Sequence, residues 1–98
     1  MNKITICVKD IISGTSTNTE AIPLFIAMDD ILKNNNSIVL SLKSCNPMSS
    51  SFLNSSFGSI IEKYGWDFLK GKISIIDYTP ALADLIKNYL AKSKDLTF

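Results

Sequence analysis

Apolar residues form three short runs that predict β-strands. Lys3–Val8 alternates apolar and polar residues, so its isoleucines share one face, and Ile11-Ile12 either prolong this strand or form a short second one. Ser37–Leu42 is almost continuously apolar, which is typical of a strand in the middle of a sheet. Lys72–Tyr78 has a similar pattern and predicts a third strand.

Between these runs, apolar residues recur at the spacing of α-helices. Ala21–Lys33 predicts a first helix with a broad apolar face, which either lies between the sheet and a neighbouring helix or contacts a partner along one flank. Ser49–Tyr64 predicts a second helix with a narrower buried stripe. Thr79-Pro80 starts a third helix as an N-cap followed by proline, and Lys92–Phe98 is expected to be a flexible tail.

The resulting order, β-α-β-α-β-α, predicts a single α/β domain over residues 1–98. Short connections and right-handed crossovers favour a mostly parallel or mixed sheet backed by helices. The pattern leaves the order of the strands in the sheet open.

Composition narrows the possible functions. The chain of 98 residues is 46% hydrophobic and 19% charged, which is enough apolar surface for a core. Its net charge is +1 and every basic residue is lysine, so we expect no nucleic acid partner and no bidentate phosphate clamp. No apolar run approaches the ~20 residues of a membrane span. The first residues lead directly into a strand rather than a signal peptide, so we expect a cytoplasmic protein.

The absence of histidine removes the commonest catalytic arrangements. It excludes Ser-His-Asp and Cys-His catalysis and most catalytic zinc sites. The carboxylates are scattered along the chain, so no metal site is expected. Cys7 and Cys45 lack a CxxC partner and are expected to be reduced thiols. We therefore expect neither a cofactor nor an enzymatic activity.

Hydroxyl-rich segments precede all three predicted helices and are the best candidates for a functional site. In a parallel sheet, the carboxyl end of each strand leads to the start of the next helix. Thr15–Thr19, Ser49–Ser51 and Thr79 are therefore expected along one edge. Serine and threonine are ordinary N-caps, yet three consecutive serines exceed what one cap needs.

A partner protein docking on this edge would contact several side chains around the serines. Phe52 follows them directly and either is an exposed docking residue or lies under a neighbouring loop. The expected partner-binding residues are Thr15, Ser16, Ser49, Phe52, Ser56 and Thr79.

Ser50 and Ser51 are candidate phosphoacceptors. A phosphate there would add about −1.5 to −2 charges at neutral pH; the helix dipole would partly stabilise it, and it would repel a docked partner. Alternatively, the N–H groups of the same helix starts bind a small molecule or a nucleotide phosphate. A third interpretation is a structural subunit whose broad first helix drives assembly, including assembly as a homo-oligomer.

The central part of the chain resembles a bacterial STAS-like family of uncharacterised function, related to the anti-sigma factor antagonists. That family has a strand with an aliphatic-Asp-aliphatic pattern, then I/M-S-S-S-F at the start of a helix that reaches F-G. The matching segments here are Ile38-Val39-Leu40-Ser41-Leu42, Met48-Ser49-Ser50-Ser51-Phe52-Leu53 and Phe57-Gly58, with Ser41 at the position of the strand Asp. The resemblance extends over nearly the whole chain through Gly14–Thr17, Leu69–Ile73 and Thr79–Leu82.

In anti-sigma factor antagonists this helix opens with Asp-Ser-Ser-Gly, and a partner kinase of the GHKL ATPase class phosphorylates the first serine. By position, the resemblance implies that Ser50 is the phosphoacceptor and Ser51 its neighbour, with Ser49 in place of the Asp and Phe52 in place of the Gly. It implies a non-catalytic regulatory domain that binds a GHKL-type ATPase or a transcriptional regulator, without direct contact to nucleic acid or membrane.

Overall fold

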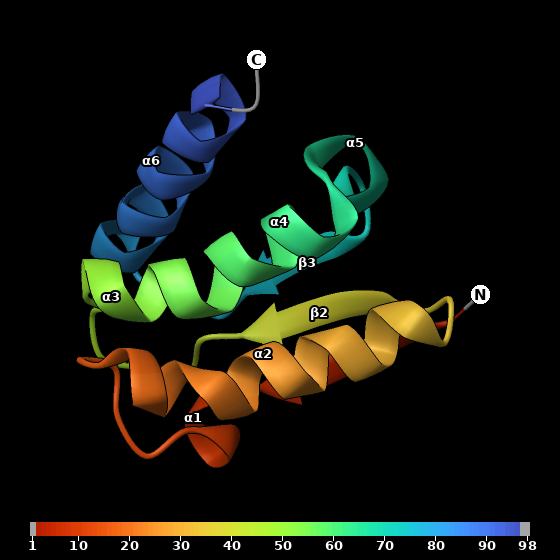
Figure 1. Cartoon of the computed structure of the whole chain (residues 1–98). Coiled ribbons are helices and arrows are strands. Elements are labelled where there is room, and N and C mark those ends of the chain that lie inside the picture. Colours follow the sequence, from red (N-terminus) through yellow and green to blue (C-terminus); the bar gives the residue numbers. More distant parts are fainter. Residues whose placement is uncertain (1, 97–98) are drawn as a thin grey trace.

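Three parallel strands form the sheet of the computed structural model, which describes residues 2–96 and the side chains through residue 91 (Figure 1). β1 (Lys3–Cys7) pairs with β2 (Ser37–Ser41), and β2 pairs with β3 (Ile73–Ile76). The predicted central position of the most apolar strand is therefore confirmed.

The helices connect and follow these strands. They are α1 (Val8–Ile11), α2 (Asn18–Lys33), α3 (Ser50–Leu53), η1 (Asn54–Gly58), α4 (Ser59–Tyr64), α5 (Trp66–Leu69) and α6 (Pro80–Leu96). α3, η1 and α4 form one continuous helix, of which η1 is a π-helical segment. The predicted α/β architecture, with helices backing a parallel sheet, is confirmed. Within the described residues, no helix has the length and apolar character needed to cross a membrane.

The order of the strands places the crossover helices on one face of the sheet. Each connection leads to the next strand in the same direction, and right-handed crossovers then put α2 and the α3–α4 helix on the same side (Figure 1). Ile6, Leu40 and Ile75 lie level with one another and face this side. Thr5 and Ser74 lie on the opposite face of the sheet and are exposed. This exposure explains why polar residues alternate with apolar ones in β1 and β3.

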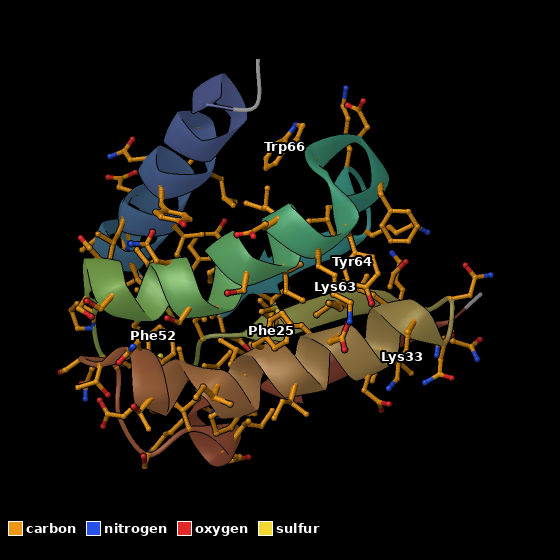
Figure 2. All side chains as sticks on the ribbon, viewed as in Figure 1. Phe25, Lys33, Phe52, Lys63, Tyr64 and Trp66 are labelled. Carbon is orange, nitrogen blue, oxygen red and sulfur yellow. The ribbon has the colours of Figure 1, made fainter. Side chains whose placement is uncertain are left out.

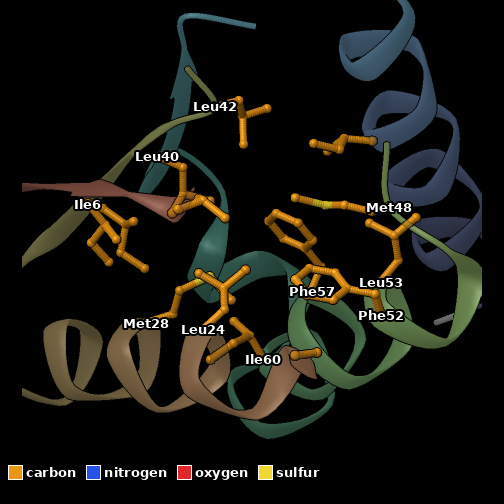
Figure 3. Packing of buried hydrophobic residues seen from close by; sticks show 14 of the residues in the cluster. Ile6, Leu24, Met28, Leu40, Leu42, Met48, Phe52, Leu53, Phe57 and Ile60 are labelled. Atoms are coloured by element: carbon orange, nitrogen blue, oxygen red, sulfur yellow. The ribbon is translucent and has the colours of Figure 1, made fainter. Parts of the chain in front are cut away.

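The hydrophobic core fills the space between the sheet and these helices (Figure 3). Leu24 and Met28 of α2 belong to one buried cluster with Leu40 of β2, and Phe57 and Ile60 of the second helix complete it. All five side chains are at most 1% exposed. Burial of this kind contributes about 1.5 to 3 kcal/mol per large apolar side chain, so the core is the main stabilising feature.

The segment after β1 differs from its prediction. Val8 is fully buried and begins α1, and the N–H of Ile12 donates to the carbonyl oxygen of Val8 at 3.2 Å. Because this bond closes a helical turn, the expectation that Ile11-Ile12 prolong the strand or form another one is wrong. The strand ends at Cys7.

Two helix boundaries also differ. α2 begins at Asn18, three residues before the predicted start, because Thr17 caps it. Pro23 therefore lies in the second turn, where its missing N–H leaves the carbonyl oxygen of the exposed Thr19 to solvent. The backbone of α6 continues to Leu96, beyond the expected start of the tail at Lys92, while residues 97–98 of that tail lie outside the described residues.

The predicted helix Ser49–Tyr64 contains a π-helical segment that its apolar spacing did not indicate. Within the segment, the hydroxyl of Ser56 donates to the carbonyl oxygen of Phe52 at 2.8 Å. Gly58 has no Cβ that would collide with the Tyr89 hydroxyl, which approaches from α6 and donates to Oδ1 of Asn54 at 2.9 Å. Small and hydroxyl-bearing residues thus allow close packing of α6 on this segment.

The burial of α2 leads to a test of the core. Leu24→Ala removes a fully buried side chain and should lower the free energy of unfolding by about 2 to 5 kcal/mol. Ile26→Ala on the same helix is the matched control, because Ile26 is 59% exposed and its truncation should cost well under about 1 kcal/mol. Urea unfolding followed by circular dichroism measures both, and equal costs would contradict the orientation of α2.

Candidate functional site

The carboxyl edge of the sheet brings the hydroxyl-rich segments together. Cys7, Ser41 and Ile76 are level in the register at the ends of the three strands. α2, α3 and α6 all begin after this edge, and a hydroxyl side chain caps each of them. The hydroxyl of Thr79 accepts from the N–H of Leu82 at 3.2 Å, so its role in capping is confirmed.

Ser49 joins two of the hydroxyl-rich segments. Its Oγ accepts from the N–H of Phe52 at 3.1 Å, which caps α3, and donates to the carbonyl oxygen of Ser16 at 2.7 Å. Its N–H donates to the carbonyl oxygen of Thr15 at 2.9 Å. Thr15, Ser16 and Ser49 are therefore adjacent, as expected, and Ser49 fixes the loop before α2 to the start of the second helix.

Ser50 and Ser51 occupy the first two helical positions of α3. Both side chains are exposed, and within the described residues neither hydroxyl has a hydrogen-bond partner. Ser49 performs the capping, so its two neighbours remain accessible to a partner protein or to a modifying enzyme.

Glu20 occupies the concave side of the loop before α2. Its Oε1 accepts from the N–H groups of Ser16 at 3.1 Å and Thr17 at 3.0 Å, while the Thr17 hydroxyl caps the N–H of Glu20 at 3.2 Å. Gly14 leaves the space that the carboxylate fills, because a Cβ there would overlap it. This reciprocal capping satisfies donors that would otherwise be open to an external anion.

Phe52 and Ser56 do not contribute to the exposed edge. Phe52 is fully buried, so the second of its two alternatives holds and it packs inside the molecule (Figures 2 and 3). Ser56 is also fully buried, and its hydroxyl is satisfied within the helix. The prediction that a docked partner would contact these two residues is therefore corrected. The helix buries two adjacent ridges rather than one, because it lies between α2 and α6.

Asp77 is a residue of this edge that the sequence patterns missed. It follows β3 with a left-handed backbone (φ 56°), a conformation that Asp tolerates better than most residues. Its Oδ2 accepts from the hydroxyl of Ser41 at 2.7 Å. The carboxylate that lies beside the end of β2 thus comes from the turn after β3 and not from β2 itself.

A cavity of about 250 Å³ lies beside the hydroxyl cluster, between the loops that follow β1 and β2. Lys9, Thr15 and Cys45 contribute to its lining. Burial, and to a lesser extent the nearby Cys7, raises the pKa of the Cys45 thiol, which reduces its thiolate fraction and hence its reactivity. Both cysteines are free, as predicted.

A second polar cluster lies at the other end of the α3–α4 helix, roughly 20 Å away at the rise of a helix. The hydroxyl of Tyr64 donates to Oδ1 of Asp29 at 2.6 Å, and Nζ of Lys63 lies 2.8 Å from the same oxygen (Figure 2). The bonds from Lys63 and then Tyr64 lower the pKa of Asp29. Desolvation, followed by the bond to Asp29, raises the pKa of Tyr64 to about 12. These bonds connect α2 to α4.

Residues 20–83, about two thirds of the chain, match the model of one protein family, described as STAS-like domain of unknown function (DUF4325). The chain belongs to this family. No curated protein and no solved structure gives a significant match.

The STAS-like match includes the serines at the start of α3 and the α6 cap at Thr79. It begins at Glu20, so Thr15 and Ser16 precede it. Among the described residues of this STAS-like domain, no group of three or more side chains is arranged to hold a metal ion. The edge therefore offers exposed hydroxyls, capped helix starts and a carboxylate, which suit docking or acceptance of a phosphoryl group.

The double role of Ser49 can be tested against its neighbour. Ser49→Ala removes the α3 cap and the bond to the loop, and should lower the free energy of unfolding of the STAS-like domain by about 1 to 2 kcal/mol. Ser50→Ala, the matched control, removes an exposed hydroxyl and should change it by less than about 0.5 kcal/mol. Chemical denaturation measures both; a larger effect at Ser50 would contradict this assignment.

The Tyr64–Asp29 bond predicts a loss of stability at high pH. The folded-state pKa of Tyr64 is about 12, above the ~10 of an unfolded tyrosine, so its stabilising effect is complete below pH ~10. It is lost as the pH rises towards 12, because the ionised phenol fits the fold less well. The difference in thermal midpoint between the native protein and Tyr64→Phe should therefore shrink over this interval.

Absorbance at 295 nm provides a second measurement of the same group. Tyr64→Phe should remove a tyrosine component that titrates near pH 12, whereas the control Tyr78→Phe, at a side chain 54% exposed, should retain it. An unchanged titration in Tyr64→Phe would disprove the assignment.

Proposed function

We propose that this STAS-like domain is a non-catalytic regulatory module that binds a partner protein through the carboxyl edge of its sheet. The docking surface consists of the exposed or partly exposed hydroxyls of Thr15, Ser16, Ser50, Ser51 and Thr79. The observation that supports it most is the arrangement around Ser49, which is bonded on both sides and holds its two neighbours outward.

We further propose that phosphorylation of Ser50, or of Ser51, switches the docking. A phosphate at the first turn of a helix is favoured by the N–H groups and the dipole, so it would not unfold α3. It would add about −1.5 to −2 charges to the docking surface. Glu20 and Asp77 already place carboxylates along this edge, so the phosphate would add to negative groups that are present there. A partner that matches the unmodified edge would then be repelled.

The partner that we propose is a GHKL-type ATPase or kinase, or a transcriptional regulator, acting in the cytoplasm. The resemblance to anti-sigma factor antagonists and the position of Ser50 at the start of α3 support this choice of partner. A kinase of that class would supply the phosphoryl group, and the serine would need no catalytic base of its own. The proposal leaves the chain without an enzymatic role.

The arrangement around Glu20 favours protein docking over the alternative of a phosphate sensor. At the start of α2, the N–H groups of Ser16 and Thr17 already bond to the Glu20 carboxylate. An incoming phosphate would have to displace this carboxylate and would be repelled by it. The alternative of a structural subunit rests instead on α2, where Ile22 and Ile26 are 49% and 59% exposed.

The switch can be tested by capturing partners from the native host with the purified domain as bait. Ser50→Asp should reduce recovery of a specifically captured partner at least tenfold relative to the native protein, while Ser50→Ala should preserve it. Asn88→Asp is the matched control, because it adds one negative charge to an exposed position of α6. Mapping phosphosites on the recovered bait should identify Ser50 or Ser51.

Equal recovery with Ser50→Asp and Asn88→Asp would show that charge at the start of α3 does not control binding. Loss of the partner with Ser50→Ala as well as Ser50→Asp would indicate that the hydroxyl itself is a contact, and would remove the need for a phosphate switch.

A further inference from the structure

The outer edge of β3 has unused hydrogen-bonding capacity. The N–H of Ile38 donates to the carbonyl oxygen of Lys72 and the N–H of Leu42 to that of Ile76, so the alternate residues of β3 face β2. In a parallel ladder the residues between them, Ile73 and Ile75, direct their N–H and C=O groups away from β2. Among residues 2–96, no strand pairs on that side, since β3 is the last strand of the sheet.

Two apolar cavities lie on the helix side of this edge. One, of about 180 Å³, is lined by Ile73 and Ile75 together with Trp66 of α5, which projects towards α6 in Figure 2. The other, of about 240 Å³, lies between Ile75 and the α6 residue Ile86. Ile75 and Leu90 line both cavities, so they adjoin along β3 and under α6.

The charged side chains that line these cavities, among those described through residue 91, have one sign. Lys70 lines the first cavity and Lys87 the second, and no acidic side chain within that part of the chain lines either of them. An occupant with acidic residues beside its apolar ones would complement this pair. A second copy of the chain would instead bring its own Lys70 and Lys87 to the shared edge, which is unfavourable for self-pairing.

We propose that β3 accepts a fourth strand from a partner protein, an extended segment with apolar residues at alternate positions and acidic residues at its ends. Its backbone bonds to Ile73 and Ile75, and the apolar side chains on its inner face enter the two cavities. This is strand addition at an open sheet edge, in which the main chain supplies affinity and the pockets supply selectivity. This site is separate from the carboxyl edge of the sheet, where Ser50 and Ser51 lie, and the inference stands independently of the proposed function.

A synthetic peptide provides a direct test with the chain of residues 1–98. The probe has alternating Val and Thr residues between Glu pairs, and its counterpart has Lys pairs instead. In NMR titrations the Glu-flanked peptide should shift the amide signals of Ile73 and Ile75 and slow their hydrogen exchange. It should bind at least tenfold more tightly than the Lys-flanked peptide.

Two variants distinguish the effect of the lysines at the cavities from the effect of the overall charge of the protein. Lys70 and Lys87 are both exposed, so the combined change Lys70→Glu and Lys87→Glu should weaken binding of the Glu-flanked peptide roughly tenfold, as expected for the replacement of two surface charge pairs by like charges. Lys43→Glu, at an exposed position in the connector after β2, should leave it unchanged. Both changes replace lysine by glutamate, so the comparison is matched in chemistry.

Three results would overturn the proposal. One is equal binding by a peptide that carries N-methyl groups on the amides facing β3, because these cannot donate to the edge. Another is the absence of shifts at Ile73 and Ile75 with millimolar peptide. The third is a stable dimer of the peptide-free protein, by light scattering, that Ile75→Lys converts to a monomer, since a second copy would then occupy this edge.

Discussion

The sequential order of three parallel strands is the constraint on which the rest of the structure depends. With right-handed crossovers, this order sends α2 and the α3–α4 helix to the same face, and it brings the starts of α2, α3 and α6 to the same edge. One face of the sheet is therefore deeply buried, and the carboxyl edge collects the capping hydroxyls of Thr17, Ser49 and Thr79. The same order leaves β3 without a neighbour on its outer side within the described residues.

At the carboxyl edge of the sheet, one serine caps α3 and the two serines after it are exposed. Ser49 is held by the loop and by α3, while Ser50 and Ser51 face outward. The capped first turn holds these hydroxyls outward, on the surface that the proposed partner would contact. Glu20 has a complementary role, because its carboxylate accepts from the N–H groups of the loop that would otherwise be open to an anion.

Local sequence patterns predicted the strands and helices of the fold. The features that these patterns did not predict depend on contacts between residues far apart in the sequence. Apolar periodicity located the strands and helices, and the Thr17-to-Glu20 spacing was itself a readable signal for the earlier start of α2. The burial of Phe52 depends on the packing of α3 against α2, which one helix's own spacing does not encode. The Ser41–Asp77 bond depends on strand register over a separation of 36 residues.

The π-helical segment also affects how α3 is oriented relative to α4. Asn54–Gly58 has more residues per turn than an α-helix. The side chains of α3 and α4 therefore do not follow one continuous α-helical register. Phe52 and Leu53 are buried on α3 itself, so the outward direction of Ser50 and Ser51 is set by that burial and by the bonds of Ser49. Lengthening or shortening that segment by one residue would rotate α3 by about 100° relative to α4, so it would move the exposed serines and, together with them, bring the buried Phe52 towards the surface.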